Sequence, residues 1–207
     1  MKEGEFMDEN KIGNIESIEM NGQVAIKSEN SPFATSFYFD NYYDDKAVKK
    51  FIKSCERMIR HSTEYKLYIE QLRSNLSELN RDVVQGNITT LDADLEFHHY
   101  PFSLYDLIEI YMIKAMLEDR KITTYSVSRA IMDLHYKHHV GLVPLGKTNH
   151  ELVHDGKLFI SENQIFGNFK QFARDYDIAI SMDLKAKLKD LKNYTEKDSP
   201  TDFMGII

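Results

Sequence analysis

The chain has little cysteine and no long apolar run. Cys55 is the single cysteine in 207 residues, which excludes an internal disulfide framework and a cysteine-rich zinc knuckle. No window approaches about 18 consecutive apolar residues, so we expect no membrane span. The acidic start, MKEGEFMDEN, lacks the apolar region of a signal peptide, which argues against secretion. These absences lead us to expect a cytoplasmic protein.

Charge is unevenly distributed along the chain, whose net charge is −7. Residues 1–45 contain 3 Lys and Arg against 10 Asp and Glu, a net charge of −7, whereas residues 46–81 contain 9 against 4, a net charge of +5. An acidic protein is a poor nonspecific binder of phosphate backbones. The basic segment is a candidate footprint for a polyanion, although a solvated basic helix face is the commoner explanation.

The periodicity of apolar residues predicts an α+β fold. Asn21 and Gly22 between alternating runs indicate a β-hairpin over residues 14–28. Apolar residues three and four apart predict a long amphipathic helix over residues 45–80, broken near residues 61–63, with Cys55 as a small core residue. A strand is expected to end at Pro101, and a helix to begin after Ser103 as its N-cap. The remaining expected elements are a helix from residues 123–124 to 139, a strand over 142–145, a short helix over 147–156 capped by Thr148, a strand or hairpin arm over 157–167, helices over 168–177 and 181–197, and a tail over the last ten residues.

Four of the eight histidines lie in two short motifs, DLEFHHYPF at residues 94–102 and GLVPLGKTNHELVH at residues 141–154. His150 and His154 are four residues apart on a predicted helix, so both imidazoles project from one face, a spacing that suits two ligands of one divalent cation. Adjacent residues of a strand point to opposite faces. One histidine of the pair His98 and His99 can therefore supply a third ligand while the other accepts a proton.

The order of these motifs resembles that of the HNH nucleases, also called ββα-metal or His-Me finger nucleases. Residues 95–102, LEFHHYPF, are similar to the frequent opening of that family, and Leu142, Leu145, His150 and His154 match its second half. The resemblance covers about 60 residues. Within the family, the sequence looks most like uncharacterised HNH-like proteins of phages. It implies a ββα-metal core with a two-helix insertion at 103–139, preceded by a β-hairpin region with a long amphipathic helix and followed by C-terminal helices. The implied domains span 1–81, 82–170 and 171–207.

The resemblance assigns His98, His150 and His154 as metal ligands and His99 as the general base that activates water. It implies a phage-encoded endonuclease that hydrolyses DNA phosphodiester bonds in the host cytoplasm, with one divalent ion (Mg, Mn, Ni or Zn) stabilising the leaving oxygen. Glu151 and Asp155 are candidates to orient the ligand imidazoles. The residues expected to contact DNA all lie in the basic segment: Lys49, Lys50, Lys53, Arg57 and Arg60.

A second interpretation treats the same fold as a metal-stabilised structural or protein-interaction module without catalysis, for example in a virion or in host takeover. Gly141 stands at the position of the Asn in the family name, and Asn149 or a carboxylate would then complete a closed site. Its protein partner would contact the acidic N-terminal region. A third interpretation is a DNA-binding regulator. The cluster of His135, His138 and His139 ends a helix, where cationic side chains complement the dipole, and we expect no ligand role for it.

Overall fold

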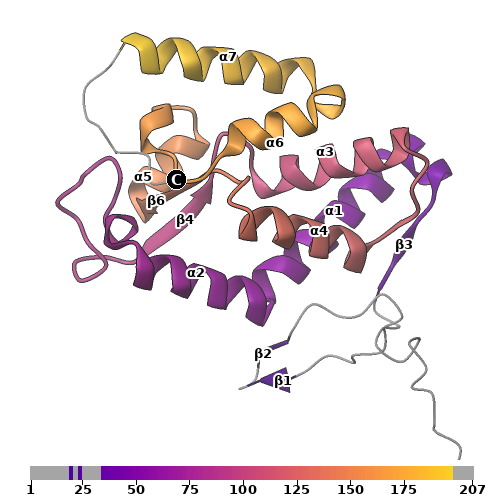
Figure 1. Ribbon diagram of the computed structural model, residues 1–207, viewed down its shortest axis with the longest axis horizontal. Coiled ribbons are helices and arrows are strands. Elements are labelled where there is room, and N and C mark those ends of the chain that lie inside the picture. Colours follow the sequence, from indigo (N-terminus) through magenta and orange to yellow (C-terminus); the bar gives the residue numbers. More distant parts are fainter. Residues whose placement is uncertain (1–18, 21–22, 25–33, 198–207) are drawn as a thin grey trace, which may run out of the picture.

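The computed structural model describes residues 19–20, 23–24 and 34–197, and these form an α+β fold that is mostly helical (Figure 1). Its strands form three antiparallel pairs: β1 with β2, β3 with β5, and β4 with β6. The strands are β1 Glu19–Met20, β2 Gln23–Val24, β3 Ser36–Phe37, β4 Leu95–His99, β5 Ile122–Thr123 and β6 Leu142–Gly146. The seven α-helices of this part are α1 Asp45–His61, α2 Thr63–Asn75, α3 Leu104–Leu117, α4 Thr124–Tyr136, α5 Lys147–His154, α6 Phe169–Asp175 and α7 Met182–Lys197. Short 3-10 helices are η2 Phe39–Tyr43, η3 Ser77–Asn80, η4 Glu162–Gln164 and η5 Asp177–Ala179.

The predicted long helix forms as α1 and α2, and a single serine separates them. Asp44 caps α1, accepting a hydrogen bond from the backbone N–H of Lys46 at 2.9 Å. Ser62 ends α1 and begins α2, because its hydroxyl donates to the Ile59 carbonyl at 2.7 Å and accepts from the Tyr65 N–H at 3.1 Å. Both bonds satisfy backbone groups that a helix end leaves free. The predicted break near residues 61–63 is therefore confirmed, and so is Cys55 as a buried core residue.

Helices α1, α3 and α4 pack against one another, and the strand pair β4–β6 lies at one end of them (Figure 1). Ser103 and Asp106 form a capping box at the start of α3, which confirms Ser103 as the N-cap. Helices α3 and α4 lie between the two histidine motifs in the sequence, where two helices were predicted. The buried apolar core takes side chains from every described α-helix except α5.

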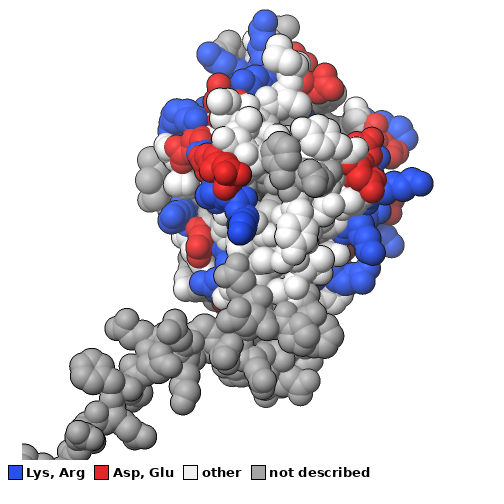
Figure 2. Space-filling view, turned by 90° about the vertical axis from the view of Figure 1, so that its right-hand side faces the viewer, with Lys and Arg blue, Asp and Glu red and all other residues white. Residues whose placement is uncertain are grey.

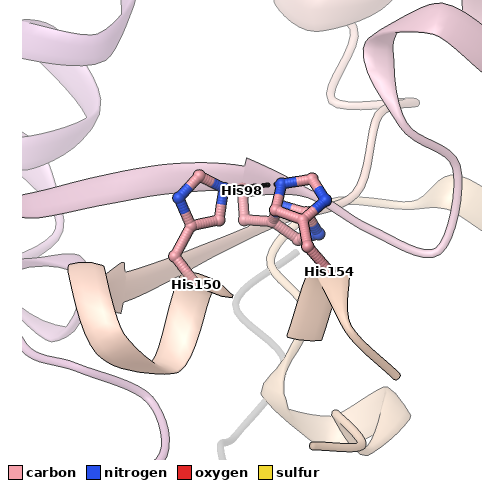
Figure 3. Close-up of side chains that lie close together, drawn as sticks. All are labelled: His98, His150 and His154. Atoms are coloured by element: carbon pink, nitrogen blue, oxygen red, sulfur yellow. Dashed lines mark hydrogen bonds between the residues drawn. The ribbon is translucent and has the colours of Figure 1, made fainter. Parts of the chain in front are cut away.

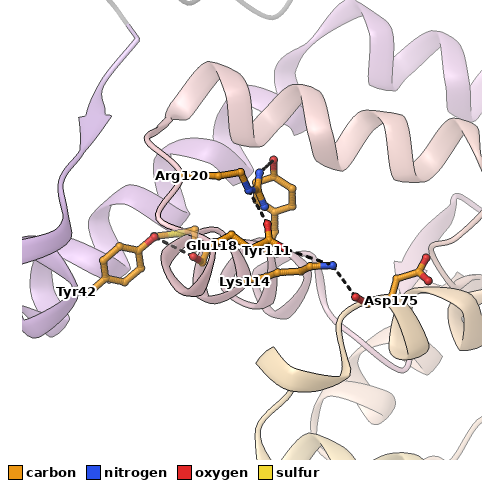
Figure 4. A network of polar contacts seen from close by, with 7 residues as sticks. Tyr42, Tyr111, Lys114, Glu118, Arg120 and Asp175 are labelled. Atoms are coloured by element: carbon orange, nitrogen blue, oxygen red, sulfur yellow. Dashed lines mark hydrogen bonds and ion pairs between the residues drawn. The ribbon is translucent and has the colours of Figure 1, made fainter.

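Side-chain contacts attach the neighbouring segments to α3 (Figure 4). The Tyr42 hydroxyl of η2 donates to the Met112 carbonyl at 2.9 Å, and Lys114 Nζ donates to the Asp175 carbonyl at the end of α6 at 2.7 Å. Arg120 Nη1 donates to the Tyr111 hydroxyl at 2.9 Å. These bonds join the N-terminal and C-terminal parts of the described chain through one helix.

The surface near this end of α3 includes a band of uncharged residues between groups of charged ones (Figure 2). Tyr43 of η2 and Ile178 of η5 are 80% and 75% exposed, and Leu117 at the end of α3 is also exposed. Within the part of the chain that the structure describes, none of the helices has the length and apolarity that a membrane crossing needs.

Two local predictions differ from the structure, and a third is confirmed. Residues 157–167 contain η4 and a single bridge from Phe166 to Leu142 in place of a strand or hairpin arm, because Ser161 and Gln164 close a capped turn. Gly146 is the N-cap of α5, so Thr148 lies within its first turn and caps nothing. The pairing of β1 with β2 confirms the hairpin, whereas its turn residues and the predicted tail lie outside the described residues.

Candidate metal centre

The strand pair β4–β6 determines where the two adjacent histidines point. His98 pairs with Val143 and His99 pairs with Leu142 in the antiparallel register. Because neighbouring side chains of a strand alternate between faces, His98 points toward α5 and His99 points toward the helical core. The two imidazoles therefore lie on opposite faces of β4.

Helix α5 brings two further imidazoles to His98 (Figure 3). His150 and His154 lie four residues apart on this helix, and their Nε2 atoms are 3.1 Å apart. The ring centre of His98 is 4.8 Å from that of His150 and 4.7 Å from that of His154. One nitrogen from each ring lies within 4.8 Å of those of the other two. The fold therefore brings together His98 of β4 and the two histidines of α5, although His98 and His150 are 52 residues apart in the sequence.

Burial keeps His98 in the form that binds metal ions. It is 9% exposed, and burial, with the neighbouring imidazoles of His150 and His154 as smaller causes, lowers its pKa to about 3. At neutral pH the ring is uncharged and one nitrogen keeps its lone pair, as a ligand requires. His154 is exposed, so the trio lies at the edge of the molecule and opens to solvent.

A carboxylate orients one of the three imidazoles. Glu96 Oε2 lies 2.8 Å from Nδ1 of His150, so this nitrogen carries the proton and donates it, and Nε2 is left to face the other rings. Glu151 and Asp155 were the residues expected to orient the ligand imidazoles. Asp155 instead pairs with Lys157 at 2.8 Å. The missed signal is the spacing in LEFHH, because Glu96 lies two residues before His98 and so shares its face of the strand.

The trio has a composition and spacing that fit one divalent ion. Zinc–imidazole bonds of about 2.0–2.1 Å in a tetrahedron place ligand nitrogens about 3.3 Å apart. The Nε2 atoms of His150 and His154 already lie 3.1 Å apart, and one nitrogen of His98 lies within 4.8 Å of the ligand atoms of both. Asn149, considered above as a fourth ligand, is buried and donates instead to Asp82 Oδ2 at 2.9 Å.

His99 lies behind the trio in a buried pair with His135. Their Nε2 atoms are 2.9 Å apart, and Nδ1 of His135 donates to the Ile131 carbonyl at 2.7 Å. Burial lowers the pKa of His135 to about 4, so the ring is neutral and its Nε2 accepts the proton of His99 Nε2–H. The ring of His99 also stacks on that of Tyr65. His99 is 4% exposed, and its burial lowers its pKa well below the usual value.

This pair corrects the interpretation of the LHYKHH cluster. His135 is buried and hydrogen-bonded to His99, so it is not a cationic side chain complementing a helix dipole. The sequence offered no signal for the pair, because the two residues lie 36 positions apart and meet through the packing of α4 on β4. The predicted general base thus lies inside the core and is bonded to another histidine.

A cavity of about 380 Å³ opens beside the trio, with Arg60, Arg73 and Glu96 among its lining residues. Of the five basic residues proposed for DNA contact, Arg60 alone lines this cavity. The others, Lys49, Lys50, Lys53 and Arg57, lie on the exposed side of α1.

These features define an α+β protein with a trihistidine cluster at the junction of a two-stranded sheet and a short helix. The chain belongs to a phage family described as "Bacteriophage G278-like virion protein", whose model matches residues 1–205. No curated protein and no solved structure matches the chain.

The family corrects several predictions made from the sequence. A virion protein family covers nearly the whole chain, so the resemblance to HNH nucleases and the hydrolase and endonuclease functions drawn from it were wrong. The HNH core specifically is not confirmed, and DNA has no support as a partner. The family implies a location in the phage particle instead of the host cytoplasm, and protein partners. The association with phage is consistent with the family.

Proposed function

We propose that this protein is a structural component of the phage particle whose β4–β6–α5 unit is held together by one divalent metal ion. His98, His150 and His154 would bind this ion, and Glu96 would orient His150. The observation that carries the proposal is the convergence of three imidazoles from two elements at ligand spacing, in a chain of a virion protein family. Bound there, the ion supplies a cross-link between β4 and α5.

Helix α5 has few other attachments, which is why a cross-link matters. It contains eight residues, has no side-chain N-cap bond, and Asn149 is its one fully buried residue. Helices shorter than about 12 residues are marginal in water unless tertiary contacts hold them. Val153 packs only partly against the core. The two histidines of α5 face β4 and provide the attachment that apolar packing does not.

The ligand set favours zinc or nickel over magnesium. Imidazole nitrogens suit borderline first-row ions, whereas magnesium prefers oxygen ligands. The position of His99 also favours a structural site, because its Nε2–H donates to His135 within the core. The residue that sequence analysis assigned to proton transfer therefore supports the packing of α4 against β4.

The test is thermal unfolding of the full chain with zinc and with a strong chelator. Saturation at 100 times Kd would stabilise the fold by about 2.7 kcal/mol, which is about 5–10 °C in Tm for a chain of this size. His154→Ala should abolish the zinc-dependent shift. His61→Ala is the matched control, because His61 is exposed and its ring bonds only to the Arg57 carbonyl of its own helix. A Tm that is the same with zinc and with chelator would refute the proposal.

Assembly provides a second test of the same function. Phage carrying His154→Ala should yield particles with less of this protein, or particles that lose infectivity at lower temperature, whereas His61→Ala should behave as wild type. Particles with a wild-type content of the His154→Ala protein and unchanged thermal stability would count against a structural role for the site.

A further inference from the structure

The cavity beside the trihistidine cluster contains more positive charge than the protein itself neutralises. Its lining includes two guanidinium groups, those of Arg60 and Arg73, and a single carboxylate, that of Glu96. Glu96 is already bonded to His150. The rest of the wall is polar but neutral or apolar, with Tyr65, Ile69 and Phe97 among its members. This imbalance indicates that the cavity receives an anion from outside the chain.

Arg73 is held in the cavity wall by its own contacts. Its Nη2 donates to the Leu95 carbonyl of β4, and its guanidinium carbon lies 5.3 Å from the ring centre of Phe97. Its Nε is buried and, among the described residues, has no hydrogen-bond partner. A buried charged donor without a partner is costly, and a pre-positioned guanidinium is typical of a site for a planar oxyanion.

Arg60 supplies the second charge from the end of α1. Its nearest carboxylate is Glu56, at 4.0 Å and one turn earlier, and the Arg60 side chain is 51% exposed. An exposed pair at that distance contributes little and leaves the guanidinium available to a ligand. Arg60 lines the same cavity as His98, His150 and His154, so its charge lies beside the trio.

We propose that this cavity binds a carboxylate side chain of a partner protein, held by Arg60 and Arg73 with one oxygen directed toward the trihistidine cluster. The inference rests on the proposed function for the ion at that cluster. Three neutral imidazoles leave the charge of a divalent ion uncompensated, and an oxygen ligand completes a tetrahedral set. Arginine binds carboxylates through two parallel hydrogen bonds, which gives both strength and orientation.

A carboxylate from a protein is favoured over a polyanion for two reasons. The chain has a net charge of −7, which repels a phosphate backbone. The few favourable contacts in one cavity do not offset this repulsion. The chain belongs to a virion protein family, which suggests protein partners. A glutamate or aspartate side chain is also small enough for a cavity of about 380 Å³.

The experiment uses the full chain loaded with Co²⁺, whose visible absorption reports its ligands, titrated with acetate and separately with inorganic phosphate. We expect acetate to change the spectrum saturably. Arg60→Gln with Arg73→Gln should raise the acetate Kd at least tenfold, with the cobalt spectrum of the anion-free protein retained. Lys157→Gln is the matched control, because Lys157 is an exposed cation just after α5 that pairs with Asp155. Arg60→Gln alone, on an exposed side chain, serves if the double variant does not fold.

The outcomes separate the two proposals. Absence of a cobalt spectrum with imidazole ligation would refute the metal site and the carboxylate site together. A normal cobalt spectrum that acetate does not change, or changes equally in the arginine variants, would refute the carboxylate site alone. A response to phosphate with at least tenfold tighter binding than acetate would overturn the assignment of the ligand as a carboxylate.

Discussion

Asp82 is the residue whose loss should most disturb the position of α5. It is a fully buried carboxylate that accepts four hydrogen bonds. Oδ1 accepts from the N–H groups of Val84 and Gln85 at 2.8 and 2.9 Å, and Oδ2 accepts from the Gly146 N–H and Asn149 Nδ2 at 2.6 and 2.9 Å. Asp82 thereby joins the loop before β4 to the junction between β6 and α5.

Asp82→Ala should destabilise the fold by about 4 kcal/mol. Hydrogen bonds to a charged group contribute roughly 1.5–3 kcal/mol each, and their sum overestimates the loss because water can enter the vacated space. Asp82→Asn should cost about half as much, because an amide keeps one acceptor oxygen and turns its NH₂ group toward two donors.

Urea denaturation followed by circular dichroism measures the effect. With a slope of about 2–3 kcal/mol per molar urea, Asp82→Ala should lower the midpoint by roughly 1.3–2 M. Asp92→Ala is the matched control, because Asp92 is an exposed loop carboxylate that bonds locally to Thr89. A midpoint for Asp82→Ala within about 0.3 M of wild type, with an unchanged slope, would refute this reasoning.

Three further predictions follow from buried groups. Burial lowers the pKa of His135 from 6.5 to about 4, so on acidification the unfolded chain binds a proton before the folded chain does. The stability that the neutral ring contributes should be complete above pH 6.5 and fall by on the order of 3 kcal/mol as the pH drops to 4. Urea midpoints that do not fall on acidification would contradict this prediction. Gly141→Ala places a Cβ against the Tyr100 carbonyl oxygen and should cost about 3 kcal/mol or more, whereas Gly86→Ala meets open space and should be nearly neutral; equal melting temperatures for the two variants would be the opposite result. Burial raises the pKa of the Cys55 thiol to about 12, so a disulfide reagent should modify it only on unfolding, and rapid labelling of the native protein would disagree.

Local patterns predicted much of the fold. Apolar periodicity identified α1 and α2. The break predicted between them lies at Ser62, which makes a capping bond to each helix. Helix spacing predicted that His150 and His154 share a face, and strand alternation predicted that one of His98 and His99 lies on the side of a third ligand. The structure places His98 there. These features depend on residues at most four positions apart, where helix and strand geometry decide which side chains share a face.

Tertiary contacts could not be predicted in the same way. The pairing of His99 with His135 depends on how the α3–α4 insertion folds back, and the role of Asp82 depends on a loop whose composition carries no such signal. The interpretation as a nuclease, which the virion protein family contradicts, also rested on local motifs. Short histidine motifs indicate that imidazoles lie close together. Phosphodiester hydrolysis also depends on whether a general base is accessible beside them. In this protein the candidate base is buried against His135.

The most direct test of the central claim is the metal content and coordination of the purified full chain. After dialysis against zinc, we predict one ion per chain, with an X-ray absorption shell dominated by imidazole nitrogens at about 2.0–2.1 Å, and loss of that ion in His150→Ala and His154→Ala. A chain that retains no zinc, or that binds it in a shell of oxygens alone, would contradict the claim that the trihistidine cluster holds a structural metal ion.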